Sequence, residues 1–168
     1  MSSLSRIYVQ FRSGKSEDAA AMTNVVRRAK ASWGYPAAWL LAWEPDLTLS
    51  AGFVGAQPTL VAEMGGEIVG IVALDDPGGI PEVAHLWVAP EVQGRGIGRE
   101  LLTRALGFAG KRGWRELRIE SDPNAVAFYE RMGARVVGRV DAPVCGEPRW
   151  LPVMRLPVPA GDDAEPPL

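Results

Sequence analysis

The sequence contains few of the residues from which proteins build disulfides and metal sites. Its 168 residues include one cysteine, Cys145, and one histidine, His85. A single cysteine cannot form an intramolecular disulfide, and residues 1–6 show no signal-peptide pattern, so we expect a cytoplasmic protein. One histidine and one cysteine are too few for a structural zinc site, and we expect no bound metal.

Long apolar runs are also missing. The longest cover residues 35–43 and 68–74, far short of the roughly 20 residues that span a bilayer, so we expect no membrane segment. Lysine and arginine are absent from residues 31–94, and the net charge of the chain is −2. Because a nucleic-acid binder needs a strongly basic surface, this composition argues against nucleic acid as a partner.

The remaining composition is typical of a single globular domain. Apolar residues make up 47% and charged residues 23% of the chain, which excludes a largely disordered, collagen-like or coiled-coil protein. The 19 glycines and 14 prolines indicate many turns and argue against an all-helical bundle.

The periodicity of apolar residues predicts a mixed α/β fold around one central sheet. Segments typical of strands and of amphipathic helices follow one another in the order β-α-α-β-β-β-α-β-α-β-β. The expected strands cover residues 7–11, 60–63, 67–74, 82–88, 115–120, 135–140 and 149–156, and the expected helices cover residues 16–29, 37–43, 96–110 and 124–132. We therefore expect one domain over residues 1–156 and a disordered tail over residues 157–168.

A glycine-rich turn lies between an expected strand and the expected helix that follows it. Gly94, Gly96 and Gly98 let successive backbone N–H groups converge without Cβ clashes. They lead into a helix N-terminus, where free N–H groups and the helix dipole favour an anion. Arg95 and Arg99 add charge-assisted donors. We interpret this turn as a cradle for a phosphate or pyrophosphate group.

Two other phosphate-binding motifs can be compared with this turn. The P-loop pattern, with its Gly-Lys-Ser/Thr ending, is absent. A dinucleotide fold needs Gly-x-Gly-x-x-Gly, whereas this turn reads Gly-x-Gly-x-Gly. Glu120 ends the next expected strand, about where a ribose-binding acid would fall. A dinucleotide-binding protein therefore stays an alternative, although the further βα units of that fold are missing.

The residues on both sides of the turn form a longer pattern. Leu-Trp-Val-Ala-Pro stands at 86–90, Gln93 to Gly98 reads Gln-x-x-Gly-x-Gly, and Asn-Ala-Val-Ala-Phe-Tyr follows at 124–129. This pattern resembles the GNAT superfamily of acyl-CoA-dependent N-acetyltransferases, most closely over residues 80–140. The resemblance implies a GNAT fold, with a mixed, mostly antiparallel sheet of about six to seven strands, about four flanking helices, and a splayed strand pair that holds CoA.

The resemblance also implies acetyl-CoA as acyl donor and assigns its contacts. The pyrophosphate would lie on the backbone amides of the glycine-rich turn. The pantetheine arm would pair with backbone groups of the preceding strand beside a β-bulge, and an asparagine would contact the arm from the other side. The residues expected to hold the cofactor are Leu86, Val88, Gln93, Gly94, Arg95, Gly96, Ile97, Gly98, Arg99 and Asn124.

Acyl transfer to an amine needs a group that accepts a proton from the amine and one that donates to the departing thiolate. Tyr129 matches the family's tyrosine beside the sulfur, which serves as general acid. Glu82 lies on the strand face that family members use for a catalytic carboxylate, and we expect it to be the general base. His85 shares that face only if a bulge reverses the alternation, and an ordered water is a third route.

The acceptor side is expected between the first helices and the last hairpin. Aromatic residues there, followed by two acids, could hold a cationic amine by charge and cation–π contact, or could simply pack together. These residues are Trp33, Tyr35, Trp39, Trp43, Glu44 and Asp46. Trp150 and residues 142–148 would shape the rim, with Cys145 as a bystander.

Together these features predict an N-acetyltransferase that works by direct attack of a primary amine in a ternary complex. The acceptor would be a small molecule or a peptide. The alternative is a GNAT-fold module that binds acyl-CoA without turnover. Dimerisation is common in the family, and no residue of the sequence decides whether this chain forms a homodimer.

Overall fold

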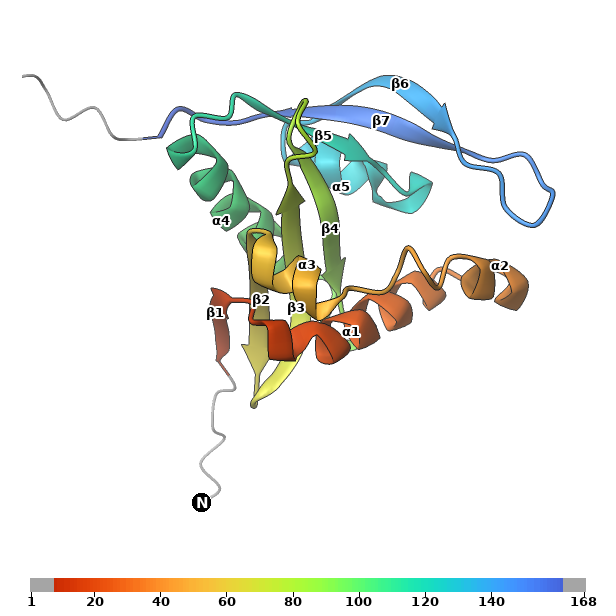
Figure 1. The fold of residues 1–168 in the computed structure, drawn as a ribbon, viewed down its shortest axis with the longest axis horizontal. Coiled ribbons are helices and arrows are strands. Elements are labelled where there is room, and N and C mark those ends of the chain that lie inside the picture. The colour runs from red at the N-terminus through yellow and green to blue at the C-terminus, as the bar shows by residue number, and fades with distance from the viewer. Residues whose placement is uncertain (1–7, 162–168) are drawn as a thin grey trace, which may run out of the picture.

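The computed structural model describes residues 8–161, while residues 1–7 and 162–168 lie outside the described part (Figure 1). Within residues 8–161, seven strands form one sheet and five α-helices flank it. The strands are β1 (Val9–Ser13), β2 (Thr59–Met64), β3 (Glu67–Asp75), β4 (Glu82–Val88), β5 (Glu116–Glu120), β6 (Arg135–Asp141) and β7 (Trp150–Pro157), and the helices are α1 (Ala19–Ala31), α2 (Ala37–Ala42), α3 (Ala51–Ala56), α4 (Ile97–Lys111) and α5 (Val126–Arg131).

The sheet has the strand order β1-β2-β3-β4-β5-β7-β6, and its neighbours are antiparallel except for β4 and β5. The parallel pair β4–β5 has one register partner, Glu82 opposite Arg118, so the two strands part beyond that point. This confirms the predicted mixed, mostly antiparallel sheet with a splayed pair. It also contradicts the dinucleotide-binding alternative, which requires a largely parallel sheet.

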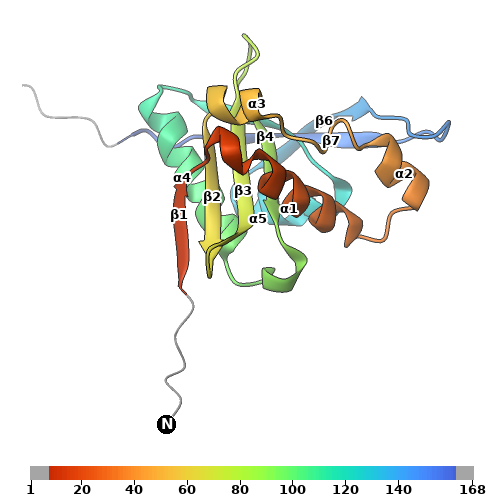
Figure 2. The same ribbon diagram turned by 60° about the horizontal axis from the view of Figure 1, so that its bottom comes forward.

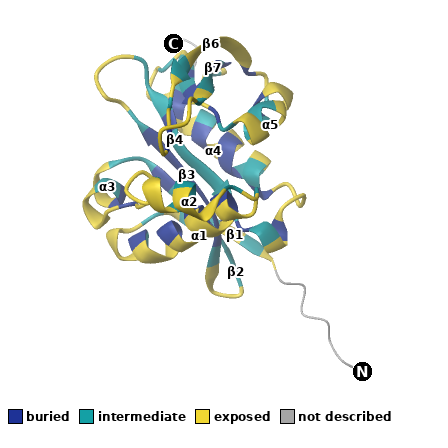
Figure 3. Ribbon diagram, turned by 90° about the vertical axis from the view of Figure 1, so that its right-hand side faces the viewer, coloured by how far each residue is buried: buried dark blue, intermediate teal, exposed yellow. Residues whose placement is uncertain are grey.

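Helices cover both faces of the central strands. Figure 2 shows α1 crossing one face of β3 and β4, with α4 behind the sheet. The α1 side has its own core, in which Met22 and Val26 are fully buried. On the α4 side, Leu101 and Leu102 are fully buried, and each such side chain contributes roughly 1.5–3 kcal/mol. Along both helices the buried residues recur every three to four positions, with exposed residues between them (Figure 3), as the apolar periodicity predicts.

A β-bulge in β4 changes which side chains share a face. Ala73 of β3 pairs with His85, but the next residue of β3, Leu74, pairs with Val83, so Ala84 is the extra residue. Val83 packs into the core on the α4 side. Glu82, its neighbour, therefore faces the α1 side together with His85. Simple alternation, which separates Glu82 from His85, is wrong here because the bulge reverses it.

Three further details differ from or extend the sequence-based expectation. Helix α3 was not expected; its start is capped by the Ser50 hydroxyl, which accepts from the Phe53 N–H, and Val54 is buried in the core. Of the tail expected from residue 157, Pro157 still pairs with β5, and Val158 donates its N–H to the Arg115 carbonyl at 2.9 Å. Ile7, the first residue of the first expected strand, lies outside the described residues.

Within residues 8–161, no helix has the length and apolar character needed to cross a bilayer.

Candidate cofactor and active site

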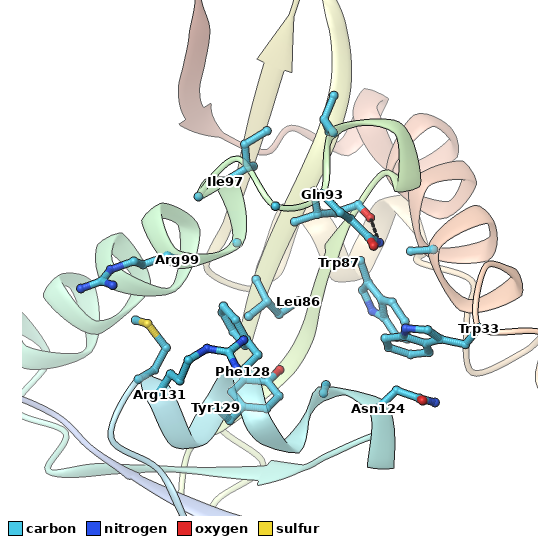
Figure 4. A pocket seen from close by; sticks show the side chains of 18 residues that line it. Trp33, Leu86, Trp87, Gln93, Ile97, Arg99, Asn124, Phe128, Tyr129 and Arg131 are labelled. Carbon is cyan, nitrogen blue, oxygen red and sulfur yellow. Dashed lines mark hydrogen bonds between the residues drawn. The ribbon is translucent and has the colours of Figure 1, made fainter.

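A cavity of about 440 Å³ opens where β4 and β5 part (Figure 4). The end of β4, the glycine-rich turn, the first turn of α4 and helix α5 form its walls, and Trp33 lies at its rim. Most of the residues predicted from the sequence line this cavity: Leu86, Val88, Gln93, Gly94, Gly96, Ile97, Gly98, Arg99, Asn124 and Tyr129. Arg95 and Glu82 are not among the lining residues.

The glycine-rich turn leaves backbone donors free at the start of α4. Gly94 and Gly96 adopt φ values of +77° and +81°, a left-handed conformation that favours glycine. Gly96 is the N-cap residue, and no side chain caps this end of the helix. The N–H groups of the first turn, from Ile97 to Arg99, therefore lack helical partners and point toward the helix N-terminus. An anion placed there meets these donors and the positive end of the helix dipole.

Strand β4 presents an unpaired backbone edge to the same cavity. In an antiparallel ladder, alternate residues direct their N–H and C=O groups to the same neighbour. The Ala89 N–H donates toward β3, whereas the Val88 carbonyl accepts from the Gln93 side chain at 3.1 Å on the opposite side. Leu86 and Val88 thus direct their backbone groups away from β3, into the gap where β5 has diverged. An extended ligand with amide groups could pair with this edge as a strand would.

Tyr129 brings a protonated hydroxyl to the cavity. The residue is buried, with 6% of its surface exposed, and burial raises its pKa well above the usual value because the charged form is penalised. No described residue hydrogen-bonds the hydroxyl, yet the described part of the chain contains no buried, unpaired side-chain polar atom. The hydroxyl oxygen must therefore reach the cavity surface, where it can donate to a ligand.

Glu82 lies outside the cavity lining, at the base of the split between β4 and β5. Its carboxylate is 3.6 Å from the Arg118 guanidinium, which also binds Glu120 at 2.9 Å. Burial raises the pKa of Glu82; the nearby charges of Glu120 and Asp75 act in the same direction, and Arg118 opposes them. A carboxylate with a raised pKa is a better proton acceptor.

His85 is packed rather than poised for proton transfer. Its ring meets Phe53 edge-on, with 5.9 Å between centroids, and its Nδ1 accepts from Trp87 Nε1 at 3.4 Å. The other ring nitrogen of a neutral histidine carries the proton, so neither nitrogen has a free lone pair. Burial lowers the pKa of His85 to about 4. This geometry argues against His85 as the general base.

The aromatic residues on the acceptor side surround one of the chain's own cations. The Lys30 ammonium lies 4.2 Å from the ring centroid of Trp43 and 4.8 Å from that of Tyr35. Arg149 lies over the same two rings. Trp39 and Trp43 pack edge to face at 5.7 Å. Trp39 and Trp43 therefore pack together, and the cations that lie over Tyr35 and Trp43 in this structure come from the chain itself.

Some cavity residues escaped sequence analysis. Phe128 and Arg131 both line the cavity, and their spacing of three on α5 places them on one face (Figure 4). The signal was therefore present in the helix pattern next to Tyr129. Trp87 also lines the cavity and was not predicted, because the sequence analysis assigned the contacts of this strand to Leu86 and Val88 alone. Cys145 lies apart, with its sulfur 3.6 Å from the Ala38 carbonyl.

Comparison with known proteins points to one family. A family model described as an acetyltransferase (GNAT) domain matches residues 48–142. The chain is 40% identical over 82 residues to the N-alpha-acetyltransferase RimI of Mycobacterium tuberculosis, a match that covers 46% of this chain and 51% of the relative. The chain spans about half the length, or less, of the curated relatives it matches.

Solved structures share the fold over nearly the whole chain. A GCN5-related N-acetyltransferase from Rhodopseudomonas palustris superimposes with a TM-score of 0.73 at 23% identity, covering 94% of this chain and 99% of that one. The PaiA N-acetyltransferase of Thermoplasma acidophilum, solved in complex with coenzyme A, gives a TM-score of 0.68 at 18% identity, covering 90% and 99%.

Proposed function

This chain belongs to the GNAT family of acetyltransferases, and on that premise we propose that it transfers an acetyl group from acetyl-CoA to a primary amine. The observation that carries the proposal is the unpaired edge of β4 beside a helix N-terminus with free N–H groups. The first suits an extended arm with amide groups, and the second suits a pyrophosphate. The fold neighbour PaiA was solved with coenzyme A, which is consistent with this ligand.

Several residues would hold acetyl-CoA. The pyrophosphate would accept from the backbone N–H groups of Ile97 to Arg99, with the Arg99 and Arg131 side chains near enough to the cavity to add positive charge. The pantetheine amides would pair with the backbone of Leu86 and Val88. When bound, acetyl-CoA supplies the activated acyl group as a thioester.

Proton transfer would be divided between two side chains. The ammonium form of the acceptor would first pass a proton to Glu82 through water, because Glu82 lies outside the cavity lining. The raised pKa of Glu82 suits this task, and with 30% of the Glu82 side chain exposed the carboxylate is accessible to water. As the C–N bond forms and the C–S bond breaks, the Tyr129 hydroxyl would donate its proton to the departing sulfur, and the second proton released by the nitrogen would return to the Tyr129 oxygen.

The acceptor is proposed to be an α-amine. RimI, with which this chain shares 40% identity over the matched segment, is named as an N-alpha-acetyltransferase. The aromatic residues that would recruit an extra cationic group already surround Lys30. A second positive charge on the acceptor is therefore not required by this site.

A module that binds acyl-CoA without turnover is the second candidate, because the proposed base does not reach the cavity. A thiol-release assay with acetyl-CoA and a panel of peptides and small amines separates the two. Acetyl transfer predicts release, with Tyr129→Phe lowering kcat by about 10²-fold or more at an unchanged Kd. Binding without release for any amine would favour the module. If saturating acetyl-CoA fails to raise the melting temperature, both proposals are overturned.

A further inference from the structure

A buried carboxylate joins four separate segments next to the cofactor cavity. The Asp122 side chain, 6% exposed, lies two residues after the end of β5. Lys30 at the end of α1 reaches it at 2.6 Å, and Arg149, just before β7, at 3.4 Å. The Tyr35 hydroxyl, from the α1–α2 connection, lies 3.0 Å from both carboxylate oxygens. Asn124, in the turn before α5, donates its backbone N–H at 2.9 Å. We call these five residues the Asp122 hub.

The Tyr35 hydroxyl uses its full hydrogen-bonding capacity within the hub. A phenol has one proton to donate and two lone pairs to accept with. It donates to Asp122 and accepts from Asn124 Nδ2 at 3.0 Å and from Arg149 Nη2 at 3.3 Å. The hydroxyl thus ties the acceptor-side connection, the final hairpin and the start of α5 to one point.

The hub also fixes which way the Asn124 amide faces. Both protons of its Nδ2 are used, one toward the Tyr35 hydroxyl and one toward Asp122 Oδ1 at 2.9 Å. The reverse orientation would place the amide oxygen against the Asp122 carboxylate, where two acceptors repel. The Oδ1 atom is therefore the polar atom of Asn124 that the hub does not use, and a cavity ligand that contacts it must present an N–H donor.

We propose that Asp122 and Tyr35 are positioning residues for cofactor binding. They hold the Asn124 amide so that its oxygen accepts from an amide N–H of the pantetheine arm, and they lock the acceptor-side segments to the same carboxylate. The inference rests on the proposed function, since it takes acetyl-CoA as the ligand. Charge supports it as well: burial would raise the pKa of Asp122, but Lys30 and the bonds from Asn124 outweigh burial and hold it below its usual value. The carboxylate is therefore ionised, and it can fix the amide throughout the neutral range.

The test uses Tyr35→Phe, which removes one hydroxyl and keeps the ring. The matched control is Trp39→Phe, because Trp39 packs on Tyr35 with 6.0 Å between centroids but makes no bond to Asn124. We expect Tyr35→Phe to raise the acetyl-CoA Kd, measured by calorimetry, by about 3- to 10-fold, in line with one lost hydrogen bond. Trp39→Phe should leave Kd unchanged while lowering the urea midpoint.

A double-mutant cycle separates positioning from simple destabilisation. If Tyr35 acts through Asn124, Tyr35→Phe should change Kd by less than 2-fold when Asn124 is already alanine. An unchanged Kd in the single variant, or a full effect in the Asn124→Ala background, would overturn the inference while leaving the proposed function intact. Failure of the unaltered protein to bind acetyl-CoA would instead overturn the proposed function and this inference together. Asp122→Asn is less suitable, because it leaves two buried cations without a counter-charge and could unfold the chain.

Discussion

His85, the chain's single histidine, is expected to couple stability to pH. Its position between Phe53 and Trp87 lowers its pKa from 6.5 to about 4, because the imidazolium loses hydration there. Between pH 4 and pH 6.5 the native protein keeps His85 neutral, while the unfolded chain binds a proton on the imidazole. The free energy of unfolding therefore carries no penalty from His85 above pH 6.5, and it decreases as the pH falls toward 4. At 1.36 kcal/mol per pKa unit, about 2.5 kcal/mol should disappear by about pH 4.5.

Urea unfolding of the unaltered protein and of His85→Gln, at about pH 7.5 and about pH 4.5, measures this contribution. Carboxylates such as Asp18 and Asp122 titrate in both proteins, so only the difference between their pH sensitivities reports on His85. We expect the unaltered protein to lose about 2.5 kcal/mol more than the variant. Its imidazole proton resonances should also stay constant down to about pH 5.5. Equal pH sensitivities, or a resonance that titrates near 6.5, would refute the reasoning and restore His85 as a candidate base.

Three further predictions concern the cavity and the core. Gly96→Asp should weaken acetyl-CoA binding, measured by calorimetry, at least about tenfold more than Gly96→Asn, because the two side chains have similar shapes and both tolerate a left-handed φ but differ in charge. If Glu82 is the base, kcat should fall at low pH as Glu82 becomes protonated, with an apparent pKa above the ordinary glutamate value of 4.5. Glu82→Gln should abolish this fall in the pH profile of kcat. Gly70→Val should lower the free energy of unfolding by about 1–3 kcal/mol in urea titrations, because a Cβ there would lie 3.0 Å from Leu101 and 3.1 Å from Ile97.

Elements with strong apolar periodicity were predictable, and elements held by tertiary contacts were not. Helix α4 follows its predicted range closely because five buried residues repeat at helical spacing along it. Helix α3 reads Ala-Gly-Phe-Val-Gly-Ala, and its two glycines weaken any helical tendency. It forms because Ser50 caps it and Val54 is buried, and only the second of these depends on the rest of the fold.

The candidate site also has parts that the local sequence predicts and parts that depend on tertiary contacts. Its backbone parts follow from local sequence, because glycine spacing and a strand-to-helix junction determine where N–H groups are free. The bulge at Ala84 depends on how β4 pairs with β3, and no local pattern reports it. The Asp122 hub depends on contacts between residues far apart in the chain: Lys30 and Asp122 are separated by 92 positions. A sequence pattern could suggest a cation near the aromatic residues, but it could not show that Lys30 is that cation.

The split between β4 and β5 needs a physical cause, because each backbone hydrogen bond left unmade in the sheet forfeits about 0.5–1.5 kcal/mol. Strand β5 pairs along its full length with β7, and beyond β5 the Ser121 N–H donates to the Pro152 carbonyl at 2.9 Å. The next residue, Asp122, is bound to α1 and to the final hairpin. These bonds draw the end of β5 away from β4, while the bulge turns β4 in its own direction. The donors and acceptors of β4 are then left for a ligand, and an extended arm with two amide groups restores more of the missing bonds than a nucleotide without such an arm could.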